Sequence, residues 1–171
     1  MSDEDYKKFY TSDLYRILYE NSENISETVR ERYNNNDNEI FSILSPMMEK
    51  FNSKTVMEFG CGGGWNLLPF HNANYTVVGY DYSPILTELG KEYGLNLHQG
   101  SFSTLEDSSI LYDVIILNHV IEHFTNFNKN MNQILQYLKP EGLLFIGVPN
   151  LDNFNKGQFQ NAHTYYFTHR T

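Results

Sequence analysis

The sequence predicts an α/β domain: a doubly wound, mainly parallel sheet with helices on both faces. Between residues 54 and 149, short apolar runs typical of buried strands alternate with longer segments that carry a helical apolar stripe. A glycine-rich loop follows the first apolar run, and an acid, Asp81, ends the second. Alternation of this kind builds right-handed βαβ units, which place helices on both faces of a parallel sheet.

The strands are short apolar runs bounded by polar or glycine-containing segments. "YDVIILN" is the most apolar of them, which is typical of a strand buried on both faces. "LNLHQG" is the weakest. The expected strands are, in chain order, 55–59, 75–81, 95–100, 112–118 and 143–149.

Helices are expected in the segments between the strands. Ser83 can cap a helix through its hydroxyl, and Pro84 suits the first helical position. Near the end of the chain, Met131, Ile134 and Leu138 recur at helical spacing. The expected helices are 65–72, 83–94 with Gly90 or Gly94 as its end, and a helix from 127 that Pro140 and Gly142 stop.

Residues 1–52 are expected to form an N-terminal helical segment, and residues 53–171 the main domain. "LYRILYE" (14–20) has an apolar stripe, "NNNDN" (34–38) reads as a loop, and a second helix is expected at about 39–51. The segment could form a lid over a substrate or pack as an amphipathic helix on the sheet, and the sequence leaves both open.

Composition narrows the classes of partner. The chain has 171 residues and a formal net charge of −9, so no global positive field attracts nucleic acid or an anionic membrane. Cys61 is the single cysteine, the N-terminus lacks the apolar centre of a signal peptide, and no apolar run approaches a membrane span. We therefore expect a cytoplasmic protein with a small-molecule partner; the oligomeric state is not readable.

The loop "GCGGGW" (60–65) suits close approach of a ligand to the backbone. A phosphate-binding P-loop needs Lys followed by Ser or Thr after its last glycine, and neither is present. A dinucleotide fingerprint needs glycine at its first, third and sixth positions; Gly60 and Gly62 match, but the sixth position is Trp65. Both of these ligand classes match poorly.

The spacing present is an acid followed by alternate glycines: Glu58, Gly60, Gly62 and Gly64. This motif resembles that of the class I S-adenosylmethionine-dependent methyltransferases, which have a Rossmann-like fold. "GYDYSPIL", "YDVIILNHVIEHF" and "LKPEGLLFIGVPN" resemble later motifs of the same family, in the same order. The resemblance covers roughly residues 50 to 150.

The resemblance implies S-adenosyl-L-methionine as the cofactor. Asp81 would bind the ribose hydroxyls, as the bidentate acceptor geometry of a carboxylate allows. Tyr82 would face the adenine, and Ser101 and Phe102 stand where relatives often carry an acid near the adenine amino group. The implied cofactor-binding residues are Glu58, Gly60, Gly62, Gly64, Asp81, Tyr82, Ser101, Phe102, Asn118 and His119.

Asn118 and His119 would border the methyl-transfer face. His119, or His163 from the last segment, is the candidate base for an oxygen or nitrogen nucleophile. Some O-methyltransferase branches of the family resemble this chain with a Glu-x-x-Glu-His metal site, so Glu122, His123 and His163 could hold a divalent ion. We expect no metal and a structural role for Glu122 and His123, with the metal site as the alternative.

Two motifs have simpler explanations. "HVIEH" (119–123) spells an inverted zinc-peptidase signature, but that chemistry needs both histidines on one helix, and His119 directly follows a strand. Cys61 is expected to be a small buried residue in a tight turn rather than a nucleophile, because no base is placed near it by the sequence.

The sequence thus predicts a methyltransferase that acts on an oxygen, nitrogen or carbon atom of a small-molecule or sugar-type acceptor. A non-catalytic S-adenosylmethionine-binding module is the alternative, and an NAD-dependent enzyme, which would share the acid at Asp81, is a weaker one. The sheet of the resembled family ends in an antiparallel hairpin. Too few residues follow 149 for that hairpin, so we expect a truncated domain without it.

Overall fold

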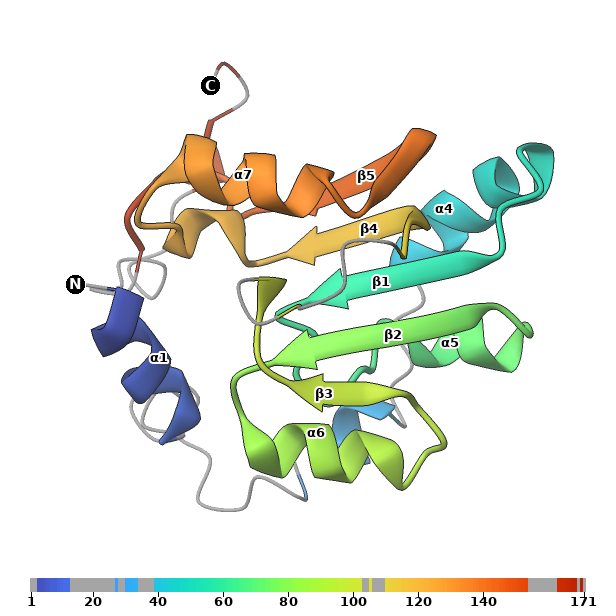
Figure 1. The fold of residues 1–171 in the computed structure, drawn as a ribbon, viewed down its shortest axis with the longest axis horizontal. Helices are drawn as coiled ribbons and strands as arrows, with labels where there is room; N and C mark the ends of the chain where they lie inside the picture. The colour runs from blue at the N-terminus through green and yellow to red at the C-terminus, as the bar shows by residue number, and fades with distance from the viewer. Residues whose placement is uncertain are drawn as a thin grey trace.

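The computed structural model describes residues 3–12, 27, 30–33, 39–102, 105, 110–153, 163–168 and 170. It confirms the predicted fold class, because five parallel strands form one sheet in the order β3-β2-β1-β4-β5 (Figure 1). The strands are β1 (Thr55–Phe59), β2 (Thr76–Asp81), β3 (Leu97–Gln99), β4 (Tyr112–Asn118) and β5 (Leu138–Gly147).

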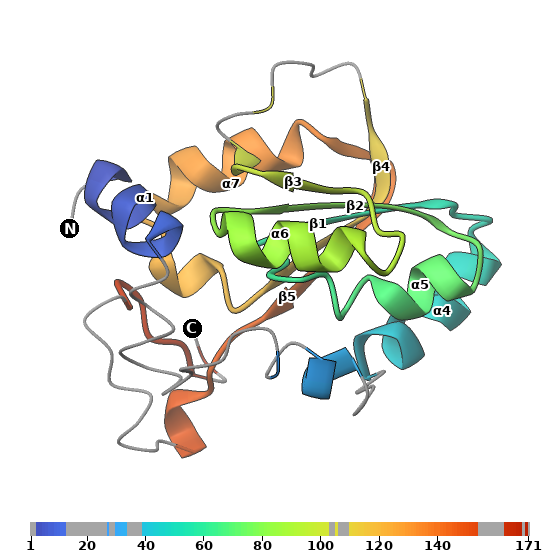
Figure 2. The same cartoon turned by 90° about the horizontal axis from the view of Figure 1, so that it is seen from below.

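Helices cover both faces of this sheet (Figure 2). One face carries α4 (Glu39–Lys50), α5 (Leu68–Asn72) and α6 (Pro84–Lys91), and the other carries α7 (Phe127–Leu135). Each face buries its own apolar cluster: Val56, Val114 and Ile116 point to the first, and Met57, Ile115 and Leu117 to the second. This alternation follows from the two-residue period of a strand.

A short N-terminal helix, α1 (Asp3–Thr11), lies beyond the carboxyl ends of the strands (Figure 1). The chain order reverses between β1 and β4, and a doubly wound sheet binds its ligands above such a switch point. The remaining short elements are the 3₁₀ turns η2 (Ile121–His123) and η3 (Leu151–Asn153). The predicted helix over 14–20 lies outside the described residues.

Most predicted elements are present, but several of their ends are shifted. α5 begins at Leu68 rather than 65, because the carbonyl of Gly64 accepts hydrogen bonds from the amides of Leu67 and Leu68 in a preceding turn. α6 continues through Gly90 instead of ending there. Ser83 caps α6 as predicted and accepts a bond from Leu86 N at 3.4 Å.

The helix predicted from 127 ends earlier than its apolar stripe, and β5 starts earlier than predicted. β5 begins at Leu138 and contains Pro140, which the sequence had suggested as a helix stop. A proline is tolerated there because, among the described residues, β5 pairs only with β4 and lies at the edge of the sheet. The register shift between Tyr112 and Val114 takes up the extra residues.

Residues 39–50 belong to the packed core. Leu44 and Met48 of α4 are buried in the same apolar cluster as Val56 of β1. Among the described residues, no helix is long and apolar enough to cross a membrane, and the sheet has no antiparallel hairpin.

Candidate cofactor and methyl-transfer site

A pocket of about 540 Å³ opens at the carboxyl ends of β1, β2 and β4. Its size and its mixture of aromatic and polar walls are typical of a cofactor site. The residues that line it come from α1, from the segment around Arg32, from the loops after the strands and from α7. They are Tyr10, Arg32, Phe59, Gly60, Gly62, Trp65, Asn66, Asp81, Tyr82, Ser83, Gly100, Ser101, Phe102, Asn118, His119, Val120, His123, Phe124, Thr125, Lys129, Asn130 and Gln133.

The glycine loop forms one wall of the pocket. Gly60 and Gly62 adopt the left-handed conformation, with φ of 67° and 56°. A Cβ at Gly60 would lie 2.7 Å from Val120 Cγ2, and one at Gly62 would lie 2.2 Å from the ring of Trp65. Trp65 therefore occupies space that only a glycine at position 62 leaves available.

Asp81 anchors this loop at the end of β2. Its Oδ2 accepts the amide hydrogen of Gly62 at 2.8 Å, and its Oδ1 accepts that of Ser83 at 2.8 Å. A carboxylate oxygen carries two lone pairs and can accept more than one hydrogen bond, a geometry that suits ligand hydroxyls. The carboxylate lines the pocket.

Two of the predicted cofactor-binding residues do not line the pocket. Gly64 packs against the β3 side of the core, where a Cβ would lie 2.7 Å from Leu95 Cδ1. Glu58 is fully buried and accepts a hydrogen bond from Asn66 Nδ2 at 2.7 Å, while its Oε2 has no partner among the described residues. Burial raises the pKa of Glu58 to about 8. Glu58 thus touches the pocket only through Asn66.

Aromatic side chains form the opposite wall. Phe102 contacts the rings of Phe59 and Phe124 edge to face, at centroid distances of 5.8 Å each. Tyr82 and the buried Ser101 complete this part of the pocket. An apolar wall with a small polar group suits a flat purine ring.

Asn118 and His119 lie between the glycine loop and the rest of the pocket, at the end of β4. His119 has a φ of 56°, an uncommon conformation for a residue with a side chain. Its amide donates to the carbonyl of Gly147 at 2.8 Å, and its Nδ1 lies 3.4 Å from Glu122 Oε1. His119 therefore turns the chain from β4 into η2 next to a carboxylate.

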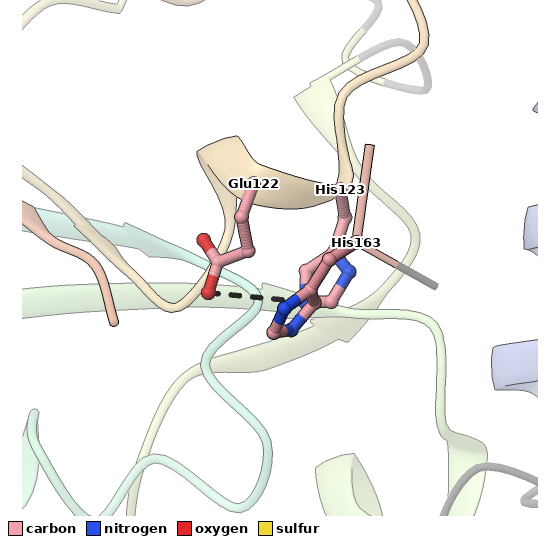
Figure 3. A group of neighbouring side chains, drawn as sticks. All are labelled: Glu122, His123 and His163. Carbon is pink, nitrogen blue, oxygen red and sulfur yellow. Dashed lines mark ion pairs between the residues drawn. The ribbon is translucent and has the colours of Figure 1, made fainter. Parts of the chain in front are cut away.

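Glu122, His123 and His163 come together in a group of which only His123 lines the pocket (Figure 3). One potential ligand atom from each lies within 4.8 Å of the others. Glu122 is 1% exposed, and neither of its carboxylate oxygens has a hydrogen-bond partner among the described residues. His163 is brought there because the amides of Thr164 and Tyr165 donate to the carbonyl of Glu122, at 2.7 and 3.1 Å.

The comparisons with known proteins agree with this geometry. A family described as "Methyltransferase domain" matches residues 30–170, most of the chain. The chain belongs to this methyltransferase family.

The curated relatives of this methyltransferase domain are longer than the chain. The ubiquinone biosynthesis O-methyltransferase of Rickettsia prowazekii is 27% identical over 143 residues, which are 80% of this chain and 50% of the relative. An uncharacterized methyltransferase of Oceanobacillus iheyensis is 30% identical over 109 residues, or 61% of this chain and 51% of the relative. The chain thus spans about half the length of these relatives.

Solved structures place the fold in the same group. PKMT2 from Rickettsia typhi in complex with AdoHcy is 27% identical, with a TM-score of 0.50 over 55% of this chain and 20% of that one. CalS10, an amino pentose methyltransferase with bound SAM, has a TM-score of 0.56 at 17% identity, over 68% of this chain and 52% of that one, and supports the fold alone. The predicted methyltransferase family, its Rossmann-like fold and S-adenosylmethionine as its cofactor are confirmed.

Sequence reasoning missed several residues of the pocket of this methyltransferase domain. Tyr10 reaches it from α1, and Arg32 lies with its guanidinium 4.6 Å from the centroid of the Trp65 ring. Lys129 and Gln133 face it from α7. No local pattern marks these residues, because tertiary packing alone brings them to the strand ends.

The two simpler explanations hold. Cys61 is buried, and its pKa is raised by burial and by the nearby charges of Asp81 and Glu58, which disfavours a reactive thiolate. His119 precedes η2 in a left-handed turn, so His119 and His123 do not share one helix as a peptidase site requires.

Proposed function

We propose that this methyltransferase domain transfers the methyl group of S-adenosylmethionine to a hydroxyl oxygen of a small-molecule acceptor. The observation that carries the proposal is the group formed by Glu122, His123 and His163, of which His123 lines the cofactor-sized pocket. A buried carboxylate and two imidazoles are suited to removing or polarising a proton, which a hydroxyl acceptor must lose as its oxygen is methylated.

The cofactor would lie along the glycine loop. In this arrangement Asp81 accepts hydrogen bonds from the two ribose hydroxyls. The adenine is enclosed by Tyr82, Ser101 and Phe102. Gly60 and Gly62 let the backbone approach the methionine part. Arg32 supplies a cation on the same side, above Trp65, and suits the cofactor's carboxylate. Glu58 and Gly64 support the loop from the core.

The bond changes follow from the donor. The acceptor oxygen attacks the methyl carbon, the carbon–sulfur bond breaks, and its electron pair returns to sulfur to leave a neutral thioether. The sulfonium is a good leaving group, so the protein's task is to align the acceptor, exclude water and remove the hydroxyl proton. Asn118 and His119 line the pocket, so His119 can take the proton directly. The alternative base, His163, lies beside the pocket residue His123, with the two ring centroids 4.9 Å apart.

Glu122, His123 and His163 also fit a divalent ion. The buried carboxylate of Glu122 has no hydrogen-bond partner among the described residues, which is costly unless a cation or donor satisfies it. A carboxylate with two imidazoles suits first-row metals. Such an ion would supply Lewis-acid polarisation of the acceptor hydroxyl and lower its pKa. This geometry supports the metal alternative over the metal-free site that the sequence favoured.

The acceptor class is taken from the curated relatives and the pocket walls. The relatives named ubiquinone biosynthesis O-methyltransferases favour a phenolic hydroxyl, and the aromatic side chains Tyr10, Tyr82 and Phe124 can contact a flat ring. A sugar-type acceptor is supported only by similarity of fold to an amino pentose methyltransferase. A non-catalytic cofactor-binding module remains the competing function.

Calorimetry with S-adenosylmethionine and with NAD, followed by transfer of a labelled methyl group to 3,4-dihydroxybenzoate, tests the proposal. We expect binding of the first ligand alone and a labelled ether product. Binding without transfer to any hydroxylated acceptor would favour the non-catalytic module. Treatment with a chelator should lower turnover by ~100-fold if a metal assists. Activity that survives the chelator, lost instead in His163→Ala, would indicate a metal-free base.

A further inference from the structure

The helix α1 reaches the reacting end of the pocket through Tyr10. The Tyr10 hydroxyl lies 3.2 Å from Nδ1 of His123, and the two rings meet edge to face at 5.8 Å. The same Tyr10 ring stacks near Tyr82, at 6.4 Å and 21°. One side chain from the start of the sequence therefore contacts both the cofactor side and the proton-transfer side of the site.

The two nitrogens of His123 have different neighbours. Nδ1 faces Tyr10, and Nε2 lies 4.0 Å from Glu122 Oε1. The ring of His163 approaches His123 from the C-terminal segment, at 4.9 Å. Three segments distant in sequence thus converge on one imidazole. When one ring nitrogen is tied by a hydrogen bond, the tautomer and the orientation of the ring are fixed together.

We propose that Tyr10 is a positioning residue of the methyl-transfer reaction. Its hydroxyl fixes the His123 ring so that Nε2 points to Glu122, and its ring closes the pocket over Tyr82. The inference rests on the proposed function, since the ring that Tyr10 orients belongs to the Glu122, His123 and His163 group that the proposal assigns to the acceptor hydroxyl. It also assigns the N-terminal helix a part in catalysis besides covering the pocket.

The hydroxyl and the ring of Tyr10 have separable roles. Tyr10→Phe removes only the hydroxyl, so the affinity for S-adenosylhomocysteine should stay within about 2-fold of that of wild type. With 3,4-dihydroxybenzoate as the acceptor, kcat should fall by about 10-fold while KM is unchanged. Tyr10→Ala also removes the ring over Tyr82, and binding of S-adenosylhomocysteine should weaken by about 5-fold. Tyr75→Phe is the control, because Tyr75 packs on Phe70 away from the pocket.

A spectroscopic readout separates positioning from general damage. Long-range ¹H–¹⁵N spectra of the imidazoles report which nitrogen of His123 carries the hydrogen. Tyr10→Phe should shift both His123 nitrogen signals, and Tyr75→Phe should leave them unchanged. Wild-type kcat together with unshifted His123 signals in Tyr10→Phe would overturn the proposal.

The same spectra distinguish failure of this inference from failure of the proposed function. If the wild-type protein transfers no methyl group, the proposed function fails. Shifted His123 signals in Tyr10→Phe would then still support the Tyr10–His123 interaction, and unshifted signals would overturn it. Thermal unfolding of each variant identifies any loss that comes from misfolding.

Discussion

Glu58, in the penultimate position of β1, carries the acid of the family's first motif in a fully buried site. Its pKa is raised from 4.5 to about 8, first by burial and further by the charge of Asp81, against the hydrogen bond from Asn66. Between these pH values the unfolded chain releases the proton and the folded chain keeps it. Folding stability therefore falls as pH rises through this window, by ~1.4 kcal/mol for each pKa unit of difference.

Glu58→Gln should flatten this pH dependence. A glutamine cannot lose a proton in either state, and like the protonated acid it places a donor group where Glu58 Oε2 has no partner among the described residues. Urea unfolding at pH 5 and pH 8 should show a smaller loss of stability for the variant than for wild type. Glu49→Gln, on the exposed side of α4, is the control. An unchanged slope for Glu58→Gln would contradict the raised pKa.

Arg32 gives a second prediction for a single residue. If its guanidinium binds the carboxylate of the cofactor, Arg32→Gln should weaken the binding of S-adenosylhomocysteine by about 10-fold. The affinity of the variant for 5′-methylthioadenosine, which lacks the amino-acid part, should stay within about 2-fold of that of wild type. Arg30→Gln serves as the matched control, because Arg30 does not line the pocket. Equal weakening of both ligands by Arg32→Gln would assign Arg32 to the adenosine end or to the fold.

The residues that sequence reasoning could place are those next to a recognisable turn. Gly60, Gly62 and Asp81 stand at strand ends, and the parallel sheet brings such ends to one edge whatever the side chains are. Tyr10 and Arg32 lie in segments without a motif, and their positions depend on how those segments pack. Glu58 shows the intermediate case: its motif was recognised, but its burial behind the loop follows from the direction of one side chain.

At the scale of elements, Gly90 shows how a helix and the cofactor loop constrain each other. It lies inside α6, where a Cβ would be 2.2 Å from the carbonyl oxygen of Gly63. Glycine to alanine inside a helix usually stabilises by about 1 kcal/mol. Here the added methyl group must push the glycine loop or the helix away, and overpacking of this kind costs ~1–3 kcal/mol.

Gly90→Ala should therefore destabilise the protein and weaken S-adenosylhomocysteine binding together. Urea unfolding and calorimetry measure the two effects. Lys91→Ala, on the exposed side of the same helix, should change neither by more than ~0.5 kcal/mol. If Gly90→Ala were more stable than wild type, this prediction would be contradicted. The result would show that α6 and the glycine loop can move apart without loss of stability.

The ends of elements were predicted less well than their order. The apolar stripe through Leu138 continued the helical spacing of α7, yet Leu138 begins β5 and pairs with Tyr112. Pairing with β4 overrides the local pattern there, and an edge strand accepts Pro140 where an inner strand would not. The predicted end of α6 was Gly90 or Gly94, and the helix ends between them, at Lys91. Gly90 is required by the neighbouring loop, and such a glycine looks the same in sequence as one that ends a helix.

For the whole molecule, the boundary between the N-terminal segment and the main domain decides what can be removed. The sequence predicted it at residue 52, ahead of β1. In the structure Ile40, Leu44 and Met48 of α4 are at most 9% exposed and pack with β1, whereas α1 lies at the mouth of the pocket. We propose that residues 39–52 belong to the folding unit and that α1 covers its site.

Two shortened chains test this division. Removal of residues 1–12 should leave a cooperative urea transition and S-adenosylhomocysteine binding, with turnover lowered through loss of Tyr10. Removal of residues 1–52 takes away the buried side chains of Ile40, Leu44 and Met48, worth ~1.5–3 kcal/mol each, and that of Tyr33. This loss is comparable with the ~5–15 kcal/mol that stabilises a typical domain. That chain should lose its near-ultraviolet circular dichroism and its cooperative transition. If the chain without residues 1–52 keeps both its near-ultraviolet circular dichroism and its cooperative transition, the domain boundary lies at residue 52. In that case α4, like α1, would lie outside the folding unit.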